Sequence, residues 1–299
     1  MKGRIIVLIG AGSFGILSTI VKLAYGKGFD VSQVVTSQLW LGALFCWLLV
    51  FIYKSIGIKT SLNTTSWWKI LVSGFPLGMT SFAYYKCVEF VPASIAILLL
   101  FQFVWMGVVL DIIFKRKRPS TLQTFSVLVL IIGTVFAAGI VDQPNLKWSL
   151  PGIGYGLLAA FGYAIFIYVN GTKNDAHFMM TAAFRSTGGA LFSMLFFLPW
   201  QGLDGISTNG LLSYGIPLAI FGIVIPPIFF AWGIPKIGTT EASIISGIEL
   251  PVAVLSASII LHEYVSFWQW FGVVLILLAI TYPQIRNIQN RPLKKQLHD

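Results

Sequence analysis

The chain has 299 residues, of which 57% are hydrophobic and only 10% are charged, and its mean hydropathy is +0.84. A soluble protein carries about 25% charged residues, so the composition excludes an ordinary soluble enzyme or binding domain and predicts one polytopic membrane unit. A formal net charge of +10 would indicate a nucleic-acid partner if the Lys and Arg residues gathered on one surface of a soluble domain. Their positions along the chain instead fit a membrane topology, as described below.

Ten apolar stretches follow one another along the chain, joined by short connections. Each is close to or above the roughly 20 residues that a helix needs to cross the hydrocarbon of a bilayer. We therefore predict an all-α membrane protein with ten transmembrane helices. The predicted spans are residues 5–25, 33–53, 67–87, 92–114, 122–141, 150–169, 178–198, 211–233, 239–261 and 267–286.

Lys and Arg are distributed unevenly over the connections. With the N-terminus in the cytoplasm, the inner segments hold fifteen of them and the outer connections hold three, Lys27, Lys86 and Lys147. Cytoplasmic segments of membrane proteins carry such an excess, so both termini are predicted to be cytoplasmic. The basic run 115–118 is then a determinant of topology, and we expect no nucleic-acid partner.

The second half of the chain repeats the first at an offset of 147 residues: Phe14 falls on Phe161, and segment 42–45 falls on the identical segment 189–192. Each half holds five spans, an odd number, so the two halves must cross the membrane in opposite directions. Such inverted repeats are typical of secondary transporters, whose solute binds near the midplane between the repeats. The predicted domains are a first repeat, a second repeat and a cytoplasmic tail, over residues 5–141, 150–287 and 288–299.

Segment 10–15 (Gly-Ala-Gly-Ser-Phe-Gly) matches the glycine pattern of dinucleotide-binding folds. That pattern has its meaning within a βαβ unit, whereas the next segment here is another predicted span. The equivalent segment 157–162 keeps small residues without the pattern. Close helix packing in lipid explains small residues in both copies.

An ionisable side chain at the centre of a membrane helix costs roughly 2.5–3.5 kcal/mol on insertion scales. Glu249 lies midway along its span, and its repeat mate is Gln102, so a polar group occurs at the same place in both halves. Gly247 and Pro251 flank Glu249, and proline interrupts helical hydrogen bonding. We predict a polar helix break at mid-membrane, although a structural salt bridge or a protonated packing residue would also explain Glu249.

Two further ionisable residues lie within predicted spans. Arg185 has Gln38 as its repeat mate, and it could pair with Glu249, contact an anionic solute group or reach the inner interface. Asp111 lies one helical turn before Lys115, where an i,i+4 ion pair explains it.

Aromatic residues also occur in the spans expected to line a central cavity. Tyr85 and Trp232 are repeat mates, and we expect both at the cavity, together with Phe14, Phe161 and Tyr163. The predicted solute-binding set is therefore Gln102, Glu249, Tyr85, Trp232, Phe14, Phe161, Tyr163 and Arg185.

Several of these features resemble the EamA domain of the drug/metabolite transporter superfamily, in two copies that cover nearly the whole chain. The marks are segment 236–243 before the ninth span, the run 249–251 (Glu-Leu-Pro), the pair His262 and Glu263, and Arg185. The first copy departs from the pattern, since Gln102 has no proline after it, Gln38 replaces the arginine and a basic run replaces the glutamate. The resemblance implies a ten-helix carrier of small metabolites, often an exporter, that hydrolyses no nucleotide.

We therefore expect a plasma-membrane carrier that works by alternating access and exports a small metabolite, such as an amino acid or an aromatic or amphipathic compound. The expected partners are this solute and membrane lipid, with no metal or other cofactor, while proton coupling through Glu249 and the oligomeric state stay open. An uptake carrier or facilitator of a sugar- or nucleotide-like metabolite is an alternative. An intramembrane enzyme would need a catalytic cluster, but the three histidines of the chain lie in connections or the tail.

Overall fold

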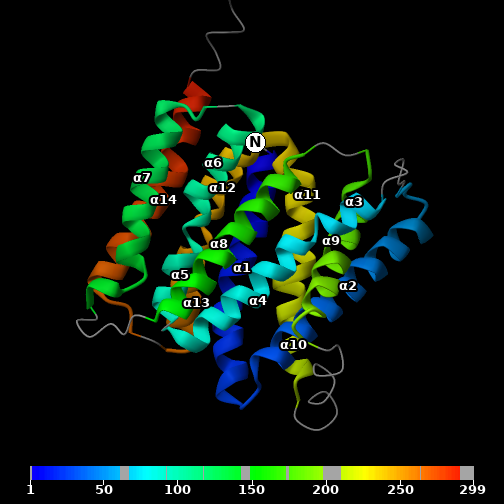
Figure 1. Cartoon of the computed structure of the whole chain (residues 1–299). Helices are drawn as coiled ribbons and strands as arrows, with labels where there is room; N and C mark the ends of the chain where they lie inside the picture. The colour runs from blue at the N-terminus through cyan, green and yellow to red at the C-terminus, as the bar shows by residue number, and fades with distance from the viewer. Residues whose placement is uncertain are drawn as a thin grey trace, which may run out of the picture.

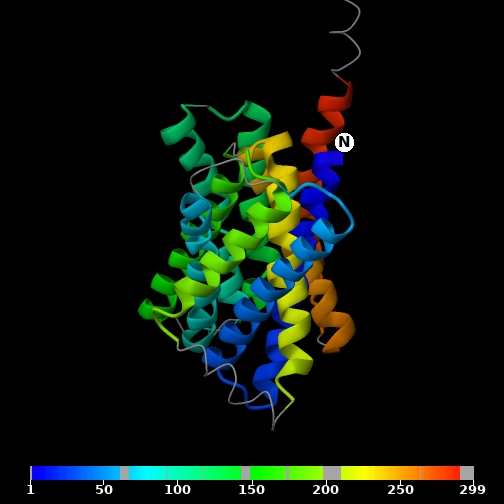
Figure 2. The same cartoon turned by 90° about the vertical axis from the view of Figure 1, so that its right-hand side faces the viewer.

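The computed structural model describes residues 2–60, 67–91, 93–116, 118–142, 149–172, 175–197, 210–262 and 264–289 (Figures 1 and 2). The predicted features at Lys117, Lys147 and Glu263, and the tail from residue 290 onward, lie outside the described residues. Within those ranges the structure is helical and contains no strand.

The first half of the chain forms α1 (Lys2–Gly26), α2 (Val31–Ser55), α3 (Trp67–Val72), α4 (Phe75–Phe90), α5 (Ala93–Leu100), α6 (Phe103–Lys115) and α7 (Thr121–Ala137). The second half forms α8 (Leu150–Asn170), α9 (Phe178–Ser193), α10 (Leu212–Ala219), α11 (Ile225–Ile237), α12 (Thr239–Ser246), α13 (Glu249–Ile260) and α14 (Phe267–Gln289). A π turn, Ile220–Val224, joins α10 to α11, and a short 3₁₀ turn, Ile140–Asp142, follows α7.

Six helical runs of the described chain are long and apolar enough to cross a membrane. They are Lys2–Gly26, Val31–Ser55, Ile95–Lys115, Leu150–Asn170, Leu212–Ile237 and Thr239–Ile260. Shorter apolar helices cover Thr121–Ala137 and Phe267–Tyr282. The helices therefore fall where the hydropathy pattern predicts apolar segments.

Capping boxes define where α2 and α7 begin. The Asp30 carboxylate accepts a hydrogen bond from the backbone N–H of Gln33 at 2.9 Å, and the Gln33 side-chain oxygen accepts one from the backbone N–H of Asp30 at 3.1 Å. Ser120 and Gln123 form the same reciprocal pair before α7. Each pair satisfies amide groups that have no partner within the helix.

The helices of the two halves pack against each other. Helix α1 packs against α11 and α13 of the second half, while its repeat mate α8 packs against α4, α5 and α6 of the first. Helix α2 lies against its own mate α9, and α7 lies beside its mate α14 at one side of the molecule (Figure 1). The first helix of each half is thus embedded in the other half.

The ends of the helices place the connections at two opposite ends of the molecule. The starts of α1 and α7 and the ends of α6 and α14 lie together at the upper end in Figure 1. The 3₁₀ turn after α7, the end of α13 and the start of α14 lie at the lower end. We call these the N-terminal end and the opposite end.

A helix break interrupts the span that contains Glu249. Helix α12 ends at Ser246 and α13 begins at Glu249. Pro251 has no amide hydrogen, so a continuous helix would lack the bond from residue 251 to the Gly247 carbonyl. In the broken span Pro251 lies in the first turn of α13, where amide hydrogens have no helical partner in any case.

The equivalent span of the first half is broken at the same level. Helix α5 ends at Leu100 and α6 begins at Phe103. The backbone nitrogen of Gln102 donates to the Leu99 carbonyl at 3.1 Å, which leaves the Leu98 carbonyl without its usual helical partner. The Gln102 side chain donates to that carbonyl, also at 3.1 Å.

The glycines of segment 10–15 lie in helix contacts. A Cβ atom on Gly15 would lie 2.4 Å from the Glu249 carbonyl oxygen, and one on Gly10 would lie 3.0 Å from the Phe229 Cβ. Only glycine at position 15 lets α1 approach the break in front of α13. The sequence interpretation of close helix packing is therefore confirmed, and it is this contact that brings α1 to the site.

Candidate solute-binding site

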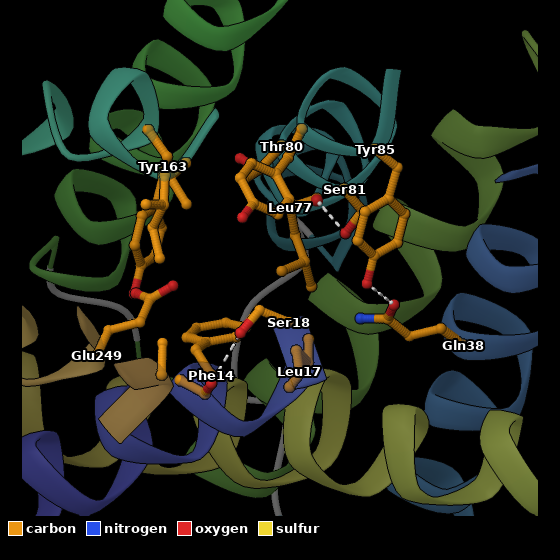
Figure 3. A pocket seen from close by; sticks show the side chains of 15 residues that line it. Phe14, Leu17, Ser18, Gln38, Leu77, Thr80, Ser81, Tyr85, Tyr163 and Glu249 are labelled. Carbon is orange, nitrogen blue, oxygen red and sulfur yellow. Dashed lines mark hydrogen bonds between the residues drawn. The ribbon is translucent and has the colours of Figure 1, made fainter. Parts of the chain in front are cut away.

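A cavity lies between the two halves, beside the break that precedes α13 (Figure 3). The volume open to water is about 60 Å³, which is room for about four to six water molecules at roughly 10–15 Å³ each. Helices α1, α2, α4 and α5 of the first half and α8 and α13 of the second contribute the walls. The lining residues are Phe14, Gly15, Leu17, Ser18, Gln38, Leu77, Thr80, Ser81, Tyr84, Tyr85, Ile97, Leu100, Tyr163, Glu249 and Ala253.

One side of the cavity is acidic and aromatic. Glu249 is only 7% exposed, and its Oε2 atom has no hydrogen-bond partner among the described residues. The Tyr163 ring ends at the Glu249 carboxyl, with Phe14 beside it (Figure 3). The Phe14 and Tyr163 rings meet edge to face, with centroids 5.5 Å apart.

The other side carries neutral polar groups. The Tyr85 hydroxyl donates to Gln38 Oε1 at 2.7 Å, and this pair lies across the cavity from Glu249 (Figure 3). Thr80 and Ser81 project from the neighbouring turn of α4 and donate to the Pro76 and Leu77 carbonyls. The hydrogens of these hydroxyls are engaged by the protein, so the hydroxyl oxygens present free lone pairs as hydrogen-bond acceptors.

Four of the predicted site residues come together here. Glu249, Tyr85, Phe14 and Tyr163 all line the cavity. The break between Ser246 and Glu249 presents the carboxyl to the cavity, since it places Glu249 in the first turn of a new helix. Tyr85 is 3% exposed and directed inward from α4.

Gln102 does not line the cavity, in contrast to the prediction. Its side-chain nitrogen Nε2 donates to the Leu98 carbonyl, and its Oε1 accepts from the half-exposed Trp105 indole at 2.8 Å. Gln102 and Glu249 therefore lie at equivalent helix breaks, but their side chains point in different directions. The Gln102 side chain bonds to the Leu98 carbonyl that its own break leaves free.

Trp232 and Phe161 also lie away from the cavity. Trp232 is 39% exposed on α11, stacked on Phe178, with the Lys236 ammonium over its ring. The π turn before α11 changes the rotation of the residues that follow it, so Trp232 does not share the direction of its mate Tyr85. Phe161 is 45% exposed, since it lies two residues before the inward Tyr163 and so on the opposite face of α8.

Arg185 is buried elsewhere, at the junction of α9 with α8 and α3. Its guanidinium donates to Ser73 Oγ at 3.0 Å, to Asn170 Oδ1 at 2.6 Å and to the Val169 carbonyl at 2.8 Å. All three acceptors are neutral, and none of them lines the cavity. The structure therefore pairs Arg185 neither with Glu249 nor with this cavity, which were two of the three roles that the sequence left open.

The sequence interpretation missed several lining residues. The repeat identifies Gln38 only as the mate of Arg185, yet an amide side chain in the middle of an apolar span is itself a signal of a polar site. Ser18, Thr80 and Ser81 carry no such signal, because hydroxyls within membrane helices commonly bond to the preceding turn, as these do.

A separate polar cluster joins the halves at the N-terminal end. The Asp111 carboxylate of α6 accepts hydrogen bonds from Thr239 and Thr240 at the start of α12, the latter from the amide at 3.1 Å and the hydroxyl at 2.7 Å. Lys115 pairs with Asp111 at 3.1 Å, which confirms the predicted i,i+4 pair. Arg4 of α1 pairs with Glu241 of α12. The described residues include no group of three or more His, Cys, Asp or Glu side chains suited to a metal.

The comparisons with known proteins agree with the resemblance noted in the sequence. The EamA-like transporter family matches residues 1–139 and again residues 150–282. The chain is 24% identical to an uncharacterized transporter of Synechocystis sp., over 94% of this chain and 92% of the relative. It is 23% identical to the uncharacterized transporter YcbK of Bacillus subtilis, over 96% and 94% of the two chains.

A solved crystal structure shares the fold, with a TM-score of 0.72 at 15% identity over 98% of this chain and 99% of the other. Family membership and the apolar helices together make this an integral multi-pass membrane protein. The chain belongs to the EamA-like transporter family and contains two copies of its characteristic segment.

Proposed function

We propose that this transporter is a secondary-active carrier of the plasma membrane that exports a small amphipathic metabolite by alternating access between two inverted five-helix repeats, with both termini in the cytoplasm. The repeat mates α6 and α13 end at opposite ends of the molecule (Figure 1). The reciprocal packing of α1 and α8 supports the same symmetry.

The cavity at the break before α13 is the observation that carries this proposal. Its walls come from both halves, so a movement of one half against the other would change the access to Glu249 from each end. Cavities of this kind, at the interface of repeats and beside a discontinuous helix, are where secondary transporters bind solute.

The polar cluster at the N-terminal end suggests which side of the cavity is closed in this conformation. Asp111 with Thr239 and Thr240, and Arg4 with Glu241, hold α6 and α1 against α12. These contacts would close the cytoplasmic side in the conformation described here. They would have to separate when the cavity turns to the cytoplasm to take up solute for export.

Glu249 has two roles open to it in such a cycle. Its side chain is the one Asp, Glu, Lys, Arg or His among the described residues that line the cavity, so it could exchange a proton for solute. It could also contact the solute directly. A Gln side chain separates these roles, because it keeps the size and hydrogen-bonding capacity of Glu but binds no proton.

The test is counterflow into liposomes that contain the purified full chain, with radiolabelled amino acids, amines, sugars and nucleosides. Glu249→Gln should lower the counterflow rate of the transported solute by at least about tenfold, the loss of one charge-assisted contact. Loss of pH-driven accumulation with retained exchange at equal pH would instead assign Glu249 to the proton.

Glu89→Gln is the matched control, because Glu89 is an acid on the surface of α4, paired with Lys86 at 2.8 Å, and it does not line the cavity. This variant should transport like the unmodified chain. Folded protein that exchanges no compound of the panel, or unchanged transport in Glu249→Gln, would contradict the proposal.

A further inference from the structure

We propose that the solute is an organic cation: a small primary or substituted amine with an apolar or aromatic body and no carboxylate. The inference rests on the carrier function proposed above and names the substrate class of the same cavity. It follows from the charge, the rings and the hydrogen-bonding character of the lining residues.

Among the described residues that line it, the cavity holds one carboxyl group and no basic side chain to pair with it. Among the fifteen described residues that line it, Glu249 is the one charged side chain, and there is no Lys, Arg or His. The buried Arg185 is engaged by three neutral oxygens outside the cavity. A carboxylate removed from water needs a compensating charge or hydrogen bonds, and Glu249 Oε2 has no protein partner among the described residues. A bound ammonium group would supply both.

Aromatic rings surround the place such an ammonium group would take. Phe14 and Tyr163 flank Glu249, and Tyr84 lies with its ring 5.9 Å from that of Tyr85 on the neighbouring wall. The face of an aromatic ring attracts a cation, and the attraction grows when both are removed from water. The same rings provide an apolar surface for the body of the solute.

The hydroxyl oxygens on the wall opposite Glu249 favour a hydrogen-bond donor on the solute. Ser18, Thr80 and Ser81 donate to carbonyls of their own helices, and Tyr85 donates to Gln38. Their oxygen lone pairs remain as acceptors. An ammonium or hydroxyl group can donate to these oxygens, whereas a carboxylate can only accept.

These features discriminate between an amine and the corresponding amino acid. The carboxylate of an amino acid would enter a cavity that already holds Glu249 and offers no basic side chain. Repulsion and unpaired burial would both weaken its binding. Phosphorylated solutes, including nucleotides, meet the same obstacle with a larger charge.

The test uses compounds that share one body and differ in charge: phenethylamine, phenylalanine and 3-phenylpropionate, with isopentylamine, leucine and 4-methylpentanoate as a second set. Binding to the purified full chain in detergent is measured by calorimetry at neutral pH. The better amine should bind at least about tenfold more tightly than its amino acid, the range expected of one charge-assisted interaction. The matching acid should bind more weakly still.

Variants test whether the Glu249 carboxyl causes the preference for the amine over the amino acid. Glu249→Gln should remove the preference for the amine, Glu249→Asp should retain it, and Glu89→Gln should leave both affinities unchanged. Monodisperse elution of each variant on size exclusion checks that it is folded. Equal binding of amine and amino acid, binding of neither amine, or a preference that survives in folded Glu249→Gln would overturn the inference.

Transport separates this inference from the proposed function. Counterflow of sugars or amino acids in preference to amines would leave the carrier function standing and overturn the substrate class. Amines that bind through Glu249 and show no counterflow would support the substrate class at this site and contradict the carrier function.

Discussion

At the residue scale, two ionisable side chains in the apolar interior differ in their hydrogen-bond partners. Arg185 distributes its guanidinium over three neutral oxygens from α8 and the α3–α4 junction. Glu249 faces a cavity with one carboxyl oxygen unpartnered among the described residues. The hydrogen bonds of Arg185 stabilise the structure around it, whereas a buried carboxyl that faces a cavity with one oxygen unbonded indicates a binding role.

Replacing Arg185 therefore should reduce stability without changing solute preference. Arg185→Met leaves the Asn170 side-chain oxygen unpaired in the interior and should lower the free energy of unfolding by about 2 kcal/mol or more, since each buried unsatisfied group costs about 1–3 kcal/mol. Thermal unfolding in detergent measures this. Arg116→Met, on an exposed arginine, is the control. A shifted amine preference with normal stability would instead place Arg185 in solute binding.

At the element scale, glycines set the distances between crossing helices. The α9 residues Gly188 and Gly189 lie against α3 and α4, where a Cβ on Gly188 would come within 1.8 Å of the Leu71 carbonyl oxygen. Backbones approach this closely in membranes only where side chains are small. The contact fixes α4, which carries Tyr85 and much of the cavity wall.

A single methyl group tests this crossing. Gly188→Ala should lower the yield of folded protein and its unfolding temperature, because α9 and α3 would have to separate. Gly154→Ala in α8 is a matched control, since nothing lies within 4 Å of the added Cβ. It should be neutral or more stable by up to about 1 kcal/mol, the helix propensity gained. Fluorescence-detected size exclusion after heating compares the unfolding temperatures of the two variants. Equal unfolding temperatures would show that α9 can move away from α3 without loss of stability.

At the scale of the whole molecule, repeat mates lie at opposite ends. The equivalent helices α6 and α13 end at the N-terminal end and at the opposite end, respectively (Figure 1). In a membrane this arrangement supports the proposed opposite orientation of the two halves, in which the basic end of α6 is expected on the cytoplasmic side.

Single cysteines report this topology. In a chain whose native thiols are removed by Cys46→Ala and Cys87→Ala, we expect Tyr264→Cys to react with a membrane-impermeant maleimide on intact cells. Arg118→Cys should react only after the cells are permeabilised. Both replaced side chains are exposed, so labelling of both from one side would refute the inverted arrangement.

Local chemistry in the sequence by itself determined much of this protein. Hydropathy predicted the apolar helical segments, the offset of 147 residues revealed the duplication, and Gly247 with Pro251 predicted a break beside a buried carboxyl. These features depend on neighbours along the chain. The family resemblance, which rests on the same local marks, is confirmed.

Only the tertiary structure decided which polar and aromatic residues share a cavity. Gln102 and Glu249 are at equivalent breaks, but one side chain satisfies its own helix and the other faces the cavity. The π turn before α11 separates the directions of Trp232 and Tyr85. Side-chain direction depends on how each helix is rotated and where it crosses its neighbours, and a one-residue change at a break or π turn alters that rotation without changing the hydropathy of the segment.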